Sequence, residues 1–267
     1  MQFIYVIDAF ADAPYRGNPA AVCLLPSPRT DAWMQTVARE MNLSETAFLL
    51  PIENGYSLRW FTPALEIALC GHATLASAHA LWSLGQLDAQ AEACFSTLSG
   101  PLTCRQSGEW IEMDFPGIAF ASALPPKALV EGIPAEIAAC GTAGDFNWLI
   151  ELPDAAAVRS LHPDFGRLST LDRGVIVTAA SDDRRYDFVS RYFVPFAGVN
   201  EDPVTGSAHC ALGPYWSHKL GRTALTGYQT SARGGVVKTA LNGDRVLLQG
   251  QAHIVSIAGL VASPDGV

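Results

Sequence analysis

Two short stretches of the sequence place a glycine and a polar side chain at the predicted start of an alanine-rich helix. ALCGHATLASAHALW contains Gly71 and His72, and DPVTGSAHCALGPYW contains Gly206 and Ser207. The first turn of a helix leaves backbone N–H groups unpaired and carries a partial positive charge, so it attracts a carboxylate or a phosphate. Taken singly, each glycine is typical of a turn followed by an ordinary helix cap. The pair favours two helix starts that face one cleft and bind a small anion.

Three side chains near these stretches are candidates for proton transfer. Glu45, in MNLSETAFL, lies between a predicted helix and an apolar strand, where an ionised carboxylate is unusual unless it is paired or functional. The pattern alone allows an exposed glutamate at a strand start equally well. His72, at a helix start, is expected to have a lowered pKa and to relay a proton. Asp202 precedes Pro203, and by pattern alone it is a turn cap.

The remaining histidines and the cysteines give no metal or disulfide signal. His79 is expected to pack within its helix, and the spacing typical of metal ligands is missing among the histidines at positions 162, 209, 218 and 253. We therefore expect no metal. The six cysteines form no CxxC pair and have no regular spacing, which is typical of buried, reduced thiols in a cytoplasmic protein.

The composition argues against several classes of partner. The chain of 267 residues carries a formal net charge of −9, which disfavours a nucleic-acid or anionic-membrane surface. Its apolar runs are shorter than the roughly 18 to 20 residues of a membrane span, and MQFIYVIDAF lacks the positive region of a signal peptide. We expect a cytoplasmic protein, with a homodimer as its assembly because twofold dimers are the commonest oligomers.

Apolar periodicity predicts the elements that must position these residues. FIYVIDAF and AAVCLL predict two paired strands around the turn RGNP, and TDAWMQTVAREM predicts a short amphipathic helix capped by Thr30 or Asp31. ETAFLLP, YSLRWFTP and EWIEMDFP are typical of strands, as are FNWLIELP, GVIVTAA and YDFVSRYFVP. Gly85 and Gly221 are expected to close the two alanine-rich helices. VVKTALNGDRVLLQG predicts a hairpin.

The two polar stretches also indicate an internal duplication. A shift of 135 residues aligns Phe61, Glu66, Gly71, Ala73 and Ala76 with Phe196, Glu201, Gly206, Ala208 and Ala211. Both stretches join a strand to a helix, which predicts two copies of about 130 residues each. Pro116-Gly117 breaks the strand EWIEMDFP, so we place the domains at residues 1–116 and 117–267. The alternative is that the last strand returns to the first domain.

Five motifs, in order along the chain, carry a resemblance to a known family: RGNPAAV, NLSETAFL, FTPALEIALCGHATLASAHAL, NEDPVTGSAHCALGPYW and QTSARGG. They resemble the PhzF-type phenazine biosynthesis-like isomerases, which have the diaminopimelate epimerase fold. The resemblance implies an α+β fold of two pseudo-symmetric domains. Each domain would be a curved, barrel-like, mostly antiparallel sheet around a central helix, with the active site between the domains.

The same resemblance implies roles for particular residues. Glu45 matches the family's acid–base glutamate, and His72, Asp202 and Ser207 match its histidine, aspartate and serine. We therefore expect a cofactor-independent isomerase in which Glu45 moves a proton on a small carboxylate substrate, while His72 and Asp202 position or relay protons. The expected substrate-binding groups are Asn18, Gly71, Gly206 and Ser207.

Two other functions stay open at this point. Related epimerases and proline racemases use two cysteines, one before each helix-start glycine, whereas here Cys70 holds the first position and Thr205 the second. A hydroxyl is far too weak an acid to replace a thiolate, so the enzyme alternative is a one-thiol racemase or a lyase that uses Cys70. The non-enzyme alternative is a protein that binds a small anion without turnover.

Overall fold

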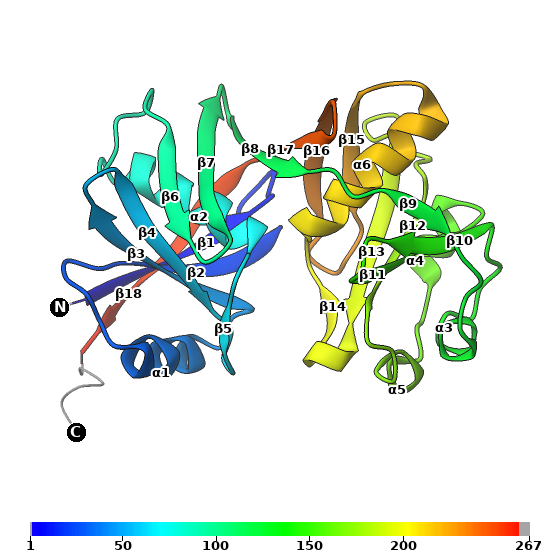
Figure 1. Cartoon of the computed structure of the whole chain (residues 1–267), viewed down its shortest axis with the longest axis horizontal. Coiled ribbons are helices and arrows are strands. Elements are labelled where there is room, and N and C mark those ends of the chain that lie inside the picture. Colours follow the sequence, from blue (N-terminus) through cyan, green and yellow to red (C-terminus); the bar gives the residue numbers. More distant parts are fainter. Residues whose placement is uncertain (1, 262–267) are drawn as a thin grey trace. The chain divides into compact units, whose positions relative to one another are not determined.

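The computed structural model describes residues 2–261, and the chain divides into two compact units (Figure 1). Unit 1 comprises Met1–Asp114 and Gln249–Val267, and unit 2 comprises Phe115–Leu248. The chain leaves unit 1 within strand β8 (Trp110–Pro116) and returns to it within strand β17 (Arg245–Gly250). The predicted boundary after residue 116 lies next to this division, and the last strand belongs to unit 1.

Unit 1 consists of strands and the helices α1 and α2. Its remaining elements are β1 (Gln2–Ala9), β2 (Asn18–Leu24), α1 (Asp31–Met41), β3 (Glu45–Ile52), β4 (Gly55–Phe61), β5 (Glu66–Ile67), α2 (Gly71–Ser83), β6 (Ala93–Thr97), β7 (Gly100–Ser107) and β18 (Ala252–Leu260). Strand β1 is antiparallel to β2 and to β18. The pairs β3–β4, β4–β5, β6–β7 and β7–β8 are antiparallel as well, whereas β2–β3 and β4–β6 are parallel.

Unit 2 is built from the same kinds of element. They are β9 (Phe120–Ser122), α3 (Lys127–Gly132), β10 (Ala139–Ala143), β11 (Asn147–Glu151), α4 (Ala155–Ser160), α5 (Phe165–Leu168), β12 (Gly174–Ala180), β13 (Phe188–Val194), the 3₁₀ turn η1 (Pro195–Ala197), β14 (Val199–Asp202), α6 (Gly206–Leu220), β15 (Ala224–Gln229) and β16 (Gly235–Asn242). The pairs β9–β10, β10–β11, β12–β13, β13–β14 and β15–β16 are antiparallel, whereas β11–β12 and β13–β15 are parallel.

The strand pairings of the two units repeat in the same order, as the predicted duplication requires. In unit 1 the series is antiparallel β1–β2, parallel β2–β3, antiparallel β3–β4 and β4–β5, parallel β4–β6 and antiparallel β6–β7. In unit 2 the same series is formed by β10–β11, β11–β12, β12–β13, β13–β14, β13–β15 and β15–β16. An edge strand completes each set, because β18 pairs with β1 and β9 pairs with β10. The chain therefore folds the same topology twice.

The register corrects one detail of the predicted alignment. In unit 1, Phe61 of β4 pairs with Thr46 of β3. The corresponding pair in unit 2 joins Phe193 of β13 to Val175 of β12, so Phe193 is the equivalent of Phe61. The alignment of Phe61 with Phe196 is wrong because the turn η1 adds residues between β13 and β14. The match of the two helix starts, at Gly71 and Gly206, is unaffected.

A repeated ion pair holds the segment that leads into each central helix. The guanidinium of Arg59 in β4 donates from Nε and Nη2 to both carboxylate oxygens of Glu66 in β5, at 2.7 and 2.6 Å. In unit 2, Arg191 in β13 makes the same two bonds to Glu201 in β14, at 2.7 and 2.8 Å. Bidentate pairs of this kind fix geometry as well as charge. They anchor β5 and β14, the last strands before α2 and α6.

Helices α2 and α6 are central within their units, which explains their composition. Residues 72–78 of α2 are all buried, and the helix packs against β1, β2, β3 and β18 (Figure 1). A helix surrounded by strands needs apolar or small residues on every side rather than one apolar stripe. In α6, a Cβ on Gly213 would lie 3.2 Å from the side chain of Thr239 in β16, so glycine allows close packing there. As predicted, Gly221 ends α6 in the left-handed conformation.

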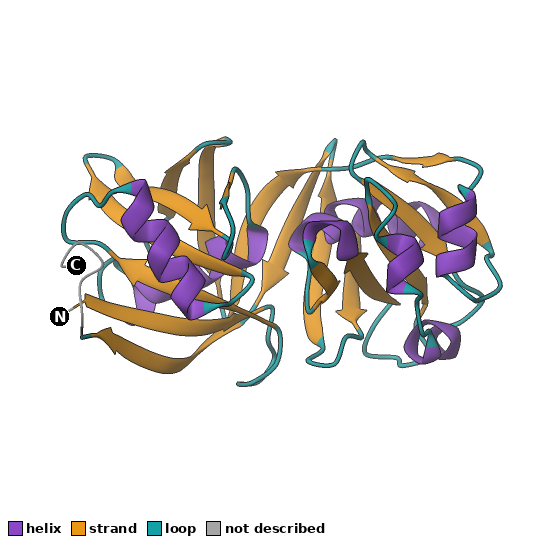
Figure 2. Cartoon of the chain, turned by 90° about the horizontal axis from the view of Figure 1, so that it is seen from below, coloured by secondary structure: helices purple, strands orange, loops and turns teal. Residues whose placement is uncertain are grey.

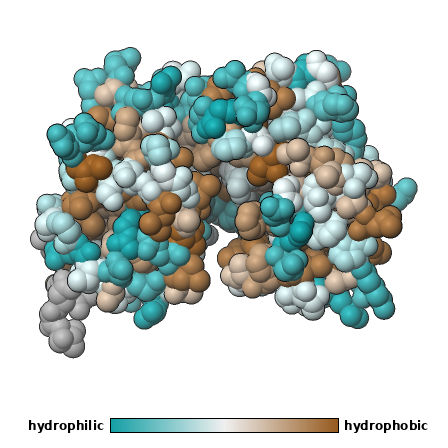
Figure 3. Space-filling model, in the orientation of Figure 1, coloured by the Kyte–Doolittle hydropathy of each residue, from teal (hydrophilic) through white to brown (hydrophobic). Residues whose placement is uncertain are grey.

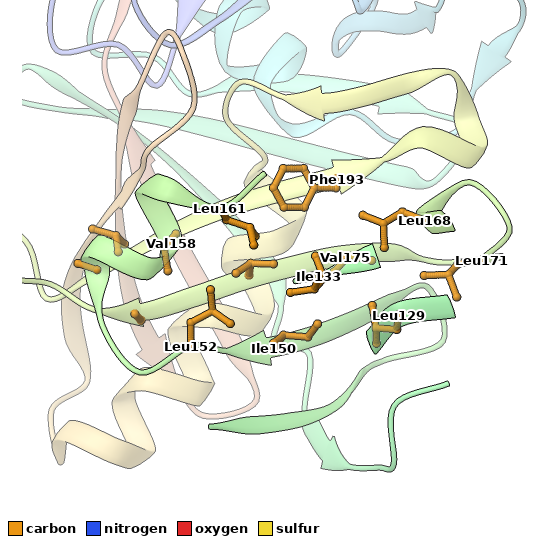
Figure 4. Close-up of a cluster of buried hydrophobic side chains, with 14 residues drawn as sticks. Leu129, Ile133, Ile150, Leu152, Val158, Leu161, Leu168, Leu171, Val175 and Phe193 are labelled. Carbon is orange, nitrogen blue, oxygen red and sulfur yellow. The ribbon is translucent and has the colours of Figure 1, made fainter. Parts of the chain in front are cut away.

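The outer helices cover the strands differently. Helix α1, capped by the side chain of Thr30 as predicted, lies across strands of unit 1 (Figure 2) and buries Trp33 and Val37 against them. In unit 2, a hydrophobic core joins strands β11 to β13 to the short helices (Figure 4). Strand residues such as Ile150 and Phe193 meet Val158 of α4 there. Within residues 2–261, none of the helices is long and apolar enough to cross a membrane.

Figure 3 shows how hydrophobic residues are distributed on one face of the molecule. On the face shown in Figure 3 they occur in separate groups between hydrophilic residues. The exposed large hydrophobic side chains of unit 1 include Leu65 and Leu69, which flank β5 on the approach to α2. All six cysteines of the described chain are free thiols, in agreement with the expectation of reduced cysteines.

Candidate functional site

Four residues of unit 1 form a cluster at the start of helix α2. Asn18 is the first residue of β2, Glu45 the first of β3, and His72 the second of α2, while Cys70 is the N-cap of that helix. Strands β2 and β3 run parallel, with Ala20 opposite Glu45, so both strands present their first residues at the same edge. We call Asn18, Glu45, Cys70 and His72 the acid–base cluster.

The imidazole of His72 joins the other three side chains. Its Nε2 lies 3.1 Å from Oε2 of Glu45. Its Nδ1 lies 3.3 Å from Nδ2 of Asn18 and 3.5 Å from Sγ of Cys70. The imidazole of His72 is thus the common neighbour of the thiol, the amide and the carboxylate.

Burial and charge tune the cluster. The side chain of His72 is only 8% exposed and that of Glu45 15% exposed, so the carboxylate retains access to solvent. Burial lowers the pKa of His72, but the neighbouring Cys70 sulfur and Glu45 carboxylate raise it by more, and the net pKa is well above its usual value. The predicted lowering of this pKa is therefore wrong, because Cys70 and Glu45 together outweigh the effect of burial.

Cys70 behaves as a thiol rather than a thiolate. Burial, followed by the charge of Glu45, raises the pKa of Cys70, and the smaller opposing effects of His72 do not reverse this. A helix start alone would lower the pKa of a cysteine. Here the carboxylate at Glu45 and the loss of solvent are stronger, so Cys70 is a poor nucleophile at neutral pH.

The two central helices lack a side-chain cap at their N-termini, as far as residues 2–261 are concerned. Within residues 2–261, the N-cap residues Cys70 and Thr205 make no side-chain cap bond to α2 or α6, and the first turns carry no acidic residue. His72 and Ser207 are each the second residue of their helix, so neither occupies the cap position. Ser207 is exposed, and Gly71 and Gly206 begin their helices as predicted. Helix starts of this kind bind carboxylates and phosphates. That both starts open into one cleft stays a prediction.

The turn before α6 is held by a buried network. The hydroxyl of Thr205 donates to Oδ2 of Asp202. Gln229, which is fully buried, accepts from the backbone N–H of Thr205 at 2.9 Å and donates to the backbone carbonyl of Asp202 at 2.8 Å. His209 faces the carbonyl of Thr205 through Nδ1 at 2.8 Å. These bonds orient the Asp202 carboxylate at the turn before α6.

Sequence reasoning missed Gln229 and the role of Thr205. Gln229 opens the motif QTSARGG, but it lies 24 residues beyond Thr205 in the sequence, and only the fold of β15 next to α6 brings the two together. The sequence pattern presents Thr205 only as a replacement for a cysteine. Its hydroxyl instead orients Asp202.

The two units differ at the position of Glu45. The register places Gly174 of β12 at the equivalent point of unit 2. A Cβ there would come within 2.2 Å of the Tyr192 hydroxyl, which donates to Oδ1 of Asn147 at 2.9 Å. Burial, with the charge of Asp202, raises the pKa of Tyr192 to about 12. The duplicated topology therefore carries the glutamate–histidine pair in unit 1, while unit 2 has a tyrosine in that place.

One group of side chains has the donors of a metal site. The ligand atoms of Glu45, Cys70 and His72 all lie within 4.8 Å of one another. The expectation of no metal depends on the spacing of other histidines. That expectation did not consider a group of ligands formed by Cys70 and His72 with Glu45, which is distant from them in the sequence.

The fold and the acid–base cluster define a two-unit α+β protein of the diaminopimelate epimerase-like type, and comparison with known proteins identifies the family. The phenazine biosynthesis-like protein family (PhzC-PhzF) matches residues 7–258. An uncharacterized isomerase of Halalkalibacterium halodurans is 53% identical over 254 residues, which cover 94% of this chain and 96% of that protein. The chain belongs to the phenazine biosynthesis-like family, as the sequence motifs predicted.

Solved structures agree with this assignment. The crystal structure of a PhzF-family phenazine biosynthesis protein from Enterococcus faecalis superposes with a TM-score of 0.92 at 40% identity, covering 97% of this chain and 99% of that one. A probable proline racemase from Agrobacterium radiobacter shares the fold, with a TM-score of 0.64 at 11% identity over 99% of this chain and 94% of its own. The names of the relatives support an isomerase of the PhzF family.

Proposed function

We propose that this protein is a cofactor-independent isomerase that moves a proton on a small carboxylate substrate by general acid–base catalysis. The observation that carries the proposal is the contact between Glu45 and His72, whose Oε2 and Nε2 atoms lie 3.1 Å apart at the start of α2. One partner is a partly exposed carboxylate and the other a buried imidazole with a raised pKa. Such a pair can accept a proton, stabilise the charge that results and return the proton.

The proposed reaction has two balanced steps. The Glu45 carboxylate removes a proton from one carbon of the substrate and becomes a carboxylic acid, leaving an electron pair delocalised toward the substrate's unsaturated or carboxylate group. The same carboxylic acid then returns a proton to a different atom of the substrate, so that a double bond shifts and the composition is unchanged. His72 and Asp202 position the reacting groups or relay this proton.

Substrate binding is proposed for the backbone and side chains at the helix starts. The uncapped N–H groups of α2 and α6 attract a carboxylate, with Gly71 and Gly206 allowing its close approach. Ser207 and Asn18 are the proposed hydrogen-bonding side chains. These roles rest on the family motifs and on the chemistry of helix N-termini.

The thiol alternative is less well supported. Cys70 lies 3.5 Å from His72 Nδ1, a distance that suits activation of a nucleophile. Its raised pKa and the neighbouring carboxylate disfavour the thiolate, and Thr205, at the second thiol position, is bonded to Asp202. A one-thiol racemase or lyase therefore requires a proton transfer that this environment opposes.

The proposal can be tested before the substrate is identified. Small molecules retained through purification would be released and identified by mass spectrometry, and candidate carboxylates would then be incubated with the protein in D₂O. Uptake of solvent deuterium at carbon by the wild-type protein, and its loss in Glu45→Gln, is the expected result. Bound ligand that never exchanges a carbon-bound hydrogen would instead favour the non-catalytic anion-binding protein.

Several further expectations remain proposals. We expect dialysed protein to retain activity without an added cofactor, which would be measured in the same D₂O assay. A homodimer, a cytoplasmic location, and the lack of nucleic-acid and membrane partners stay predictions from composition. Light scattering after gel filtration would measure the assembly directly.

A further inference from the structure

The two units place their carboxylates at different positions around the central helix. In unit 1, Glu45 of β3 and Ile67 of β5 lie in the strands on either side of β4. The equivalent of Glu45 in unit 2 is Gly174 of β12. The equivalent of Ile67 is Asp202 of β14, because each is paired with the residue that precedes the equivalent phenylalanine of β4 or β13. Unit 2 thus has a carboxylate where unit 1 has an isoleucine.

Ile67 points to the same face of the sheet as Glu45, toward helix α2. Directly opposed residues of antiparallel strands point to the same face, and successive residues alternate between faces. Arg59 and Glu66 form their ion pair on the face covered by α1, where an aspartate of that helix joins them. Ile67 follows Glu66 and lies on the other face. On that face Glu45 contacts His72 of α2.

The place of Ile67 in the chain puts it beside the start of α2. Ile67 stands three residues before Cys70, the N-cap of α2. In unit 2, Asp202 stands three residues before the N-cap Thr205, and its carboxylate accepts a hydrogen bond from the Thr205 hydroxyl. The same position in unit 1 carries an apolar side chain next to the acid–base cluster.

We propose that Ile67 determines the specificity of this site and selects a monocarboxylate with an apolar body over a dicarboxylate. This assignment rests on the proposed isomerase function, whose substrate class it names. The helix start attracts the single carboxylate, and the hydrocarbon part gains from leaving water against Ile67. A second charged group in that place would lose its hydration without gaining a partner.

The charges around the start of α2 agree with this substrate class. Glu45 repels a second carboxylate that lies between it and Ile67. The guanidinium of Arg59 is turned to the opposite face, where two hydrogen bonds join it to Glu66. Ile67 is partly exposed, and Leu69, two residues further on, is 44% exposed. Apolar surface is therefore accessible to a ligand on this approach to the helix.

Ile67→Lys tests the assignment directly, because an ammonium group at this position can pair with a second carboxylate. The probes are short straight-chain unsaturated monocarboxylates, each compared by calorimetry with the dicarboxylate of the same carbon count. Wild type should bind the monocarboxylate at least about tenfold more tightly, and Ile67→Lys should lose or reverse this preference. Ile67→Thr keeps the β-branched shape and should reduce the preference at least about threefold. It keeps the test valid if the lysine variant fails to fold.

Ile52→Lys is the matched control, because Ile52 is exposed at the opposite end of β3 from Glu45 and takes the same added charge. It should keep the wild-type preference within about twofold, since distant surface charges are screened by salt. Wild type that binds neither probe, or binds both equally, would overturn the assignment. An equal change of preference in the two lysine variants would overturn it as well.

Deuterium exchange in D₂O separates this assignment from the proposed function. If wild type and Ile67→Lys exchange hydrogen equally well on the monocarboxylate and on the dicarboxylate, the role of Ile67 is refuted and the isomerase function stands. If the expected binding preference is found but no carbon-bound hydrogen exchanges, Ile67 is the selectivity residue of an anion-binding protein and the isomerase function is refuted.

Discussion

The Glu45→Gln substitution tests the proposed mechanism most directly. Glutamine keeps the size of the side chain and its hydrogen-bonding capacity, but it cannot accept a proton at neutral pH. Removal of a general base costs roughly 10²- to 10⁴-fold in rate, or about 2.7 to 5.4 kcal/mol in the barrier. Substrate affinity should change much less, because the N–H groups of α2 and α6 still attract the carboxylate.

The structure adds a second effect of this substitution, on His72. The Glu45 carboxylate, 3.1 Å from Nε2, is one of the groups that raise the pKa of His72, so the pKa should fall in Glu45→Gln. A histidine whose pKa is raised by folding stabilises the native state fully below its unfolded pKa of about 6.5, and the stabilisation is lost as the pH rises through the folded pKa. The stability difference between wild type and variant should therefore be largest near pH 6 and shrink in alkaline solution.

Three measurements on the two proteins distinguish the outcomes. Deuterium uptake gives the rate, calorimetry gives the affinity, and urea unfolding at several pH values gives the stability. Glu40→Gln, on the exposed surface of α1, is the control and should match wild type in all three. If Glu45→Gln turns over as fast as wild type at equal affinity, Glu45 has no part in the reaction. A stability difference between the two proteins that does not change with pH would refute the electrostatic argument.

Three further substitutions have defined outcomes. Cys70→Ala should reduce isomerase activity by less than about a hundredfold, and a larger loss, beyond about 2.7 kcal/mol in the barrier, would restore the thiol mechanism. Asp202→Asn keeps an acceptor for the Thr205 hydroxyl, so the unfolding free energy should change by under about 1 kcal/mol. Turnover should fall at least tenfold, and unchanged turnover would mean that Asp202 has no part in proton transfer. Gln229→Leu leaves the buried Thr205 N–H without its acceptor and should cost about 1 to 3 kcal/mol in urea unfolding, so a cost below about 0.5 kcal/mol would contradict the role given to this network.

The local elements of the fold were predictable because their signals lie within short stretches. The cap at Thr30 and the helix ends at Gly85 and Gly221 depend on residues a few positions apart, and capping is a local interaction. The two helix starts at Gly71 and Gly206 were predicted for the same reason. The duplication was visible because both copies kept the same small residues where a helix packs inside strands.

The tertiary structure decided how these elements combine. The direction of the His72 pKa depends on Cys70 and also on a carboxylate 27 residues away in sequence, Glu45, which no rule about helix starts includes. The Gln229 network and the metal-donor set likewise join residues from separate elements. Short-range chemistry fixes where a helix begins and which side chains stand there. The charge and hydrogen-bonding state of those side chains depend on neighbours that long-range strand pairing brings within about 3 Å, and only the folded chain determines them.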